Sequence, residues 1–77
     1  MSFPDDELAL EKAILAYLAE HPQAADTLVG IAEWWLNEYQ GHVDLSTTQR
    51  VLDRLTKQGV LETVGEKEAP CYRRKMS

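Results

Sequence analysis

The sequence STTQRVLDRLTKQGVLE at residues 46–62 carries the clearest structural signals in the chain. Ser46 can cap the start of a helix, with Gln49 three residues later as its capping-box partner. Gly59 suits the left-handed position that ends many helices. The stretch therefore predicts a helix over residues 46–58, followed by a change of structure.

This helix is expected to have two contrasting faces. At 100° per residue, one face collects the core-facing side chains Thr48, Val51, Leu52 and Leu55. The other face carries Thr47, Arg50, Arg54 and Lys57. A helix that buries one side and presents arginines, a lysine and small hydroxyls on the other is one that a DNA major groove can accept. Function depends on whether that face meets DNA or only water.

Length and composition set the frame for the rest of the chain. The 77 residues are enough for one small domain, spanning residues 1–77. No apolar run reaches membrane-spanning length, and the start MSFPDDE does not resemble a signal peptide. The lone Cys71 cannot form an internal disulfide, and one cysteine cannot build a zinc or iron–sulfur site. We therefore expect a cytoplasmic protein that does not bind a membrane.

Charge is distributed unevenly along the chain. The net charge is −5. Residues 1–43 hold eight acids and one base, giving −7, and residues 44–77 hold seven bases and five acids, giving +2. This asymmetry is compatible with an oriented electrostatic surface, or with chance in a small domain.

Two further helices precede the central stretch. The first is predicted over residues 6–20, and its wide apolar arc can pack on two elements of the same chain or partly on a second subunit. The second is predicted over residues 27–39, capped by Asp26 or Thr27 and ended by Gly41. Its core stripe consists of Leu28, Ile31, Ala32, Trp35, Leu36 and Tyr39. Trp34 does not belong to this stripe. We expect it to be either a half-covered residue at the boundary of the core or a contact with a partner protein.

After Gly59 the pattern changes to period two. Residues 60–64 and 71–75 are predicted to pair as an antiparallel hairpin around a polar loop that begins with Gly65 and ends with Pro70. On the returning strand, Tyr72 and Arg74 should share one face.

This layout resembles that of the winged helix-turn-helix superfamily. The likeness lies chiefly in TTQRVLDRLTKQGVL at residues 47–61, with TLVGIAEW at 27–34 similar to the preceding helix and Tyr72-Arg73 similar to the second wing strand. The resemblance implies an α+β, mainly α fold: a three-helix winged helix-turn-helix with a C-terminal two-stranded β-hairpin wing.

The resemblance also implies DNA binding, in a role like that of small transcription regulators. The expected contacts to double-stranded DNA are Thr47, Gln49, Arg50, Arg54, Lys57, Lys67, Arg73 and Arg74. So few contacts would bind weakly from one protomer, which favours a homodimer or a protein partner.

The alternative is a non-catalytic protein–protein interaction module that does not bind DNA. The acidic first half, the wide apolar arc of the first helix and the off-stripe Trp34 suit that role. Asp53 on the outer face of the third helix would also repel phosphate.

Catalysis is not expected. His21 and His42 lie in turn regions without a companion nucleophile. The sequence contains no glycine-rich phosphate loop and no metal-ligand spacing, so we predict no enzyme activity, no metal and no cofactor.

Overall fold

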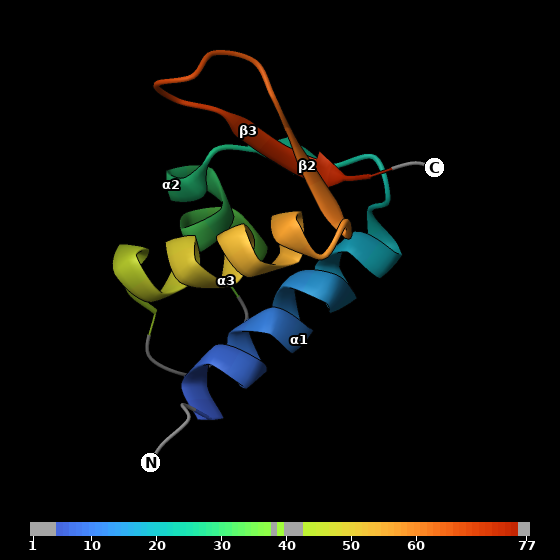
Figure 1. Ribbon diagram of the computed structural model, residues 1–77. Coiled ribbons are helices and arrows are strands. Elements are labelled where there is room, and N and C mark those ends of the chain that lie inside the picture. The colour runs from blue at the N-terminus through green and yellow to red at the C-terminus, as the bar shows by residue number, and fades with distance from the viewer. Residues whose placement is uncertain (1–4, 38, 40–42, 76–77) are drawn as a thin grey trace.

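The computed structural model describes residues 5–37, 39 and 43–75 (Figure 1). Its elements, in chain order, are α1 (Asp5–Glu20), β1 (Ala25–Asp26), α2 (Leu28–Gly30), the π-helical turn η1 (Ile31–Trp35), α3 (Leu45–Lys57), β2 (Leu61–Val64) and β3 (Cys71–Arg74). The described chain is therefore α+β and mainly helical. In Figure 1, α3 lies between α1 and the sheet, and it contacts both α1 and β2.

The start of α3 differs from the predicted cap. Asp44, rather than Ser46, is the N-cap, and its Oδ1 accepts a hydrogen bond from the Thr47 backbone N–H at 2.7 Å. A carboxylate is favoured there because it also complements the positive end of the helix dipole. The predicted capping box with Gln49 is wrong as well, since the Gln49 side chain bonds to two other residues.

The end of α3 follows the prediction. Gly59 adopts φ +81°, the left-handed region that favours glycine. The backbone N–H of Val60 then donates to the Leu55 carbonyl at 3.0 Å, which closes the turn into β2.

The predicted helix over residues 27–39 is shorter and less regular than expected. Thr27 is its N-cap, accepting from the Gly30 N–H at 3.2 Å, as predicted. The regular helix lasts only to Gly30, and η1 follows, closing with an i to i−5 bond from the Leu36 N–H to the Ile31 carbonyl at 3.2 Å. Trp35 and Leu36 are both buried, as the predicted core stripe requires. The predicted end at Gly41 lies outside the described residues.

The sheet has one strand more than predicted. The hairpin has the expected antiparallel register, from Leu61 opposite Arg74 to Val64 opposite Cys71. The short strand β1 adds to the other edge of β3, with Ala25 opposite Arg73, so the strand order is β1-β3-β2. The expected two-stranded sheet is therefore a three-stranded one, because β3 offers its second edge to the segment that leaves α1.

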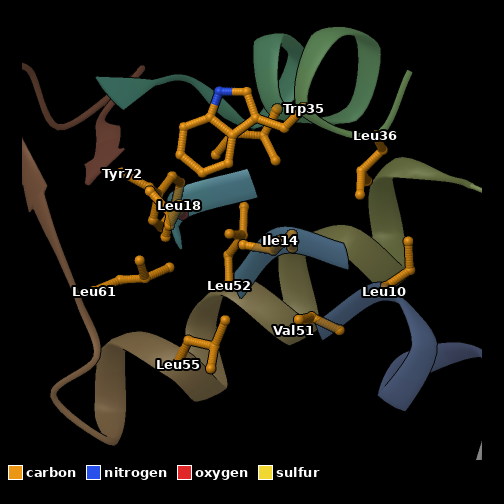
Figure 2. Close-up of a cluster of buried hydrophobic side chains, with 11 residues drawn as sticks. Leu10, Ile14, Leu18, Trp35, Leu36, Val51, Leu52, Leu55, Leu61 and Tyr72 are labelled. Carbon is orange, nitrogen blue, oxygen red and sulfur yellow. The ribbon is translucent and has the colours of Figure 1, made fainter. Parts of the chain in front are cut away.

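The core lies where α1, η1, α3 and the sheet meet (Figure 2). Its buried side chains are Leu10, Ile14, Leu18, Ile31, Trp35, Leu36, Val51, Leu52, Leu55, Leu61 and Tyr72. The core-facing side of α3 is confirmed, including the buried Thr48, whose hydroxyl donates to the Asp44 carbonyl at 2.8 Å. The helix α1 contacts both α3 and η1, which confirms that its apolar arc packs on two elements of the chain.

Candidate interaction surfaces

The arginines of α3 are held by carboxylates of α1. Arg54 donates from Nη1 to Glu7 Oε1 at 3.0 Å and from Nη2 to Glu11 Oε1 at 3.2 Å. Arg50 Nε lies 3.2 Å from the other oxygen of Glu7. Glu7 and Glu11 are four residues apart on α1, so they present two carboxylates on the same helix face. We call this set of four side chains the arginine–glutamate cluster.

Electrostatics within the cluster favour the charged guanidinium. The hydrogen bond with Glu7 is the largest effect and raises the pKa of Arg54, desolvation opposes it, and Glu11 raises it further. The side chain of Glu7 is only 13% exposed, so its carboxylate depends on these two arginines for compensation.

A separate ion pair joins the two hairpin strands. Arg73 Nε lies 2.6 Å from Glu62 Oε2, and these residues face each other in the strand register. Such a cross-strand pair neutralises an arginine that the sequence assigned to DNA phosphates.

Two other predicted DNA contacts also have partners within the chain. Gln49 Nε2 donates to the Tyr72 hydroxyl at 2.8 Å and to Asp53 Oδ1 at 2.9 Å. The Thr47 hydroxyl donates to Asp44 Oδ2 at 3.2 Å, so it belongs to the cap of α3. Both side chains stabilise the fold in this conformation.

The remaining predicted contacts lie on three different elements. Lys57 is exposed at the end of α3, Lys67 is exposed in the hairpin loop, and Arg74 is exposed at the end of β3. Arg50, Arg54 and Lys57 line one hollow of about 640 Å³ between α3 and the hairpin, together with Asp53. Arg74 instead lines a separate hollow beside Leu15 and Leu18 of α1. The structure therefore brings three of the predicted bases together and leaves Arg74 apart.

An aromatic surface lies along α1 and η1. Trp34 is 68% exposed, whereas its neighbour Trp35 is 6% exposed, as the helical stripe predicted. The rings of Tyr17 and Trp35 stack at 5.0 Å with 12° between their planes, and the His21 ring lies 4.4 Å from that of Tyr17.

Two hollows lie on this surface. One, of about 190 Å³, is lined by Tyr17, Glu20, His21, Trp34, Trp35 and Asn37. The other, of about 260 Å³, is lined by Ala13, Ala16, Tyr17, Glu20, Trp35 and Tyr39. They share three residues, and we call the pair the aromatic hollow. Sequence reasoning singled out Trp34 but missed Tyr17 and His21, although their i, i+4 spacing at the end of α1 was a usable signal.

Other kinds of site have less support. Within residues 5–37, 39 and 43–75 there is no group of three or more His, Cys, Asp or Glu side chains that could hold a metal ion. The thiol of Cys71 is free and half-buried on β3. No helix in the described part of the chain is long and apolar enough to cross a membrane. His42 lies outside the described residues.

These contacts and hollows define two candidate surfaces, one basic but internally paired and one aromatic. No protein-family model, no curated protein and no solved structure matches this chain, so the roles of its residues are argued from its own geometry.

Proposed function

We propose that this chain is a non-catalytic protein-interaction module with a winged-helix layout, and that it binds its partner through the aromatic surface around Trp34. The layout is supported by the order of the elements: three helical segments, then an antiparallel hairpin that packs against α3. Fold alone does not give function, which depends on the chemistry of the two surfaces.

The observation that carries the proposal is the arginine–glutamate cluster. Around α3, the three bases Arg50, Arg54 and Lys57 are matched by three acids, Glu7, Glu11 and Asp53. A DNA phosphate would have to displace Glu7 and Glu11 from the guanidinium groups. It would then leave two partly buried carboxylates uncompensated beside a polyanion, which is unfavourable on both desolvation and Coulomb grounds.

The aromatic surface has the features of a protein-binding site. Tryptophan and tyrosine are enriched among the residues that dominate binding energy at protein interfaces. Trp34 stands exposed beside a hollow that the stacked Tyr17 and Trp35 rings have already formed. A preformed aromatic site binds with little ordering cost.

Binding of double-stranded DNA through α3 and the hairpin is the second candidate. The observation that favours it is the hollow lined by Arg50, Arg54 and Lys57, next to the strand that ends in Arg74. For this candidate the glutamates would act as internal competitors of phosphate, and a transcription-regulator-like role would follow.

DNA titration separates the two candidates. Wild-type protein, a Glu7→Gln/Glu11→Gln variant and an Arg50→Ala/Arg54→Ala/Arg73→Ala variant are titrated into fluorescent mixed-sequence duplex at about 50 mM and 150 mM salt. We expect no salt-sensitive binding by wild type, because the arginines are already paired. Wild-type binding that weakens steeply with salt and vanishes in the triple arginine variant would establish DNA binding instead. The glutamine variant reports whether releasing the arginines is enough to create affinity.

Partner capture tests the aromatic surface. Immobilised wild type, Trp34→Ala and Val29→Ala are compared in lysate of the source cells, with captured proteins identified by mass spectrometry. Val29 is a matched control because it is an exposed apolar residue, 47% accessible, that does not line the aromatic hollow. We expect a protein that wild type and Val29→Ala retain and Trp34→Ala loses. Identical capture by all three would refute a role for the aromatic surface.

A further inference from the structure

We infer that the aromatic hollow receives an arginine side chain from the partner protein. This inference rests on the proposed function and specifies the chemistry of the partner segment that docks at Trp34. Three properties of the hollow lead to it: its size, its lining and the charge around it.

Size favours a single side chain. The two parts of the hollow measure about 190 and 260 Å³. Pockets for cofactors and drug-sized ligands are typically about 300–1,000 Å³. Each part taken alone is therefore of a size for one side chain of a protein partner, and the lining and the charge decide which side chain.

The lining favours a planar cation. Glu20 borders both parts of the hollow, and no lysine or arginine borders either. The remaining large side chains are aromatic, and their faces attract cations placed above them. A guanidinium group can lie flat against the exposed Trp34 while donating two parallel bonds to the Glu20 carboxylate, a planar geometry that the lysine ammonium lacks.

The wider charge favours the same partner. Glu20 and Trp34 belong to the first 43 residues, which hold eight acids and only one base. Two of those acids, Glu7 and Glu11, are paired with arginines of α3, which leaves six acids and one base in this part of the chain. A basic segment is therefore attracted to Glu20, and an acidic one is repelled.

The test uses short capped peptides that differ only at one central residue. That residue is arginine, its uncharged analogue citrulline, or glutamate, in each case between leucines. Each peptide is titrated to about millimolar concentration, and binding is followed by the indole N–H signals in two-dimensional NMR spectra. The chain has only two tryptophans, so Trp34 and Trp35 are the only indoles in the spectrum.

We expect the arginine peptide to shift both indole signals, with the Trp34 signal moving more. The citrulline peptide should bind about three- to tenfold more weakly, because it lacks the cation. The glutamate peptide should cause no shift. Equal binding of the arginine and citrulline peptides, or no shift with arginine at the highest concentration, would overturn the inference.

Two charge variants locate the interaction. Glu20→Gln should weaken the arginine peptide about two- to fivefold, the effect of one partly exposed ion pair. Glu66→Gln removes the same charge from the hairpin loop, which borders neither part of the hollow, and should leave the affinity unchanged. Equal losses in both variants would reduce the effect to net charge and overturn the assignment to Glu20.

Failure of this inference is distinguishable from failure of the proposed function. If the arginine peptide does not bind but Trp34→Ala still loses a captured protein, the partner chemistry is wrong and the interaction module stands. If Trp34→Ala captures the same proteins as wild type, the proposed function itself fails, whatever the peptides do.

Discussion

The adjacent residues Trp34 and Trp35 offer a paired test of the structure, because identical side chains have opposite environments. Trp35 is 6% exposed and stacks on Tyr17 in the core, whereas Trp34 is 68% exposed. Truncating a buried tryptophan to alanine costs about 3–5 kcal/mol, while a surface substitution usually changes stability by less than about 0.5 kcal/mol. Trp35→Ala should therefore destabilise the protein far more than Trp34→Ala.

The size of the expected effect can be set against the whole fold. At about 0.05–0.15 kcal/mol per residue, a chain of 77 residues is stable by roughly 4–12 kcal/mol. Loss of about 3–5 kcal/mol removes a large part of that and should lower the unfolding midpoint by more than about 10 °C. Trp35→Ala is expected to be partly unfolded at 37 °C, and Trp34→Ala to melt like wild type.

The measurement is urea unfolding followed by far-ultraviolet circular dichroism, since each variant lacks one of the two tryptophans that fluorescence would use. The urea dependence of the free energy of unfolding should be similar in wild type and Trp34→Ala. If Trp34→Ala loses as much stability as Trp35→Ala, the orientation of η1 is wrong. The aromatic surface around Trp34 would then not exist in this form.

Three further expectations concern stability. Leu52→Ala should cost about 2–5 kcal/mol in chemical denaturation, because the side chain is fully buried among α1 and η1 residues, and wild-type-like melting would contradict its position. Gly59→Ala should lower the free energy of unfolding by about 1–2 kcal/mol in the same assay, because φ is +81° at this position. No atom lies within 4 Å of the added Cβ, so the cost is backbone strain alone. An unchanged midpoint would argue against the left-handed turn. In a double-mutant cycle, Gln49→Ala and Tyr72→Phe should be coupled by about 0.5–1.5 kcal/mol through the 2.8 Å bond, and strict additivity would show that this bond contributes nothing.

Local signals in the sequence were sufficient for the elements that contain them. The helix at residues 45–57 has a complete apolar face and ends at a glycine, and the hairpin has period-two alternation on both sides of a polar loop. The predicted cap at Ser46 is wrong because Asp44 is an equally favourable N-cap residue, and it is the Asp44 carboxylate that accepts from the Thr47 N–H.

The features that the sequence did not predict depend on contacts between residues far apart in the chain. Strand β1 is only two residues long, too short to show a period, and it exists because β3 has a free edge beside it. In the arginine–glutamate cluster, Arg54 is separated along the chain from Glu7 by 47 positions and from Glu11 by 43 positions. Counting the charges in each half of the sequence could not reveal such pairs. Arg50 and Arg54, which were predicted to contact phosphate, are paired in the fold with Glu7 and Glu11 of the acidic first half.

The same physics limited what the sequence could say about the aromatic hollow. Helical periodicity separated Trp34 from Trp35 correctly, because that distinction depends only on local geometry. The meeting of Tyr17 with Trp35 depends on how α1 crosses η1, which periodicity does not specify.

The π-helical turn η1 also gives the chain a point where its length can change by one residue. A π-turn holds one residue more than the regular helix around it, as the bond from the Leu36 N–H to the Ile31 carbonyl shows. Deleting one residue there would let a regular helix form without breaking the chain on either side. The preceding Thr27 cap would stay in place, and Trp35 and Leu36 would keep their positions in the core, because the residue lost is the one that the π-turn holds in excess. A one-residue deletion in this turn should therefore disturb the core less than one in the regular helix α3.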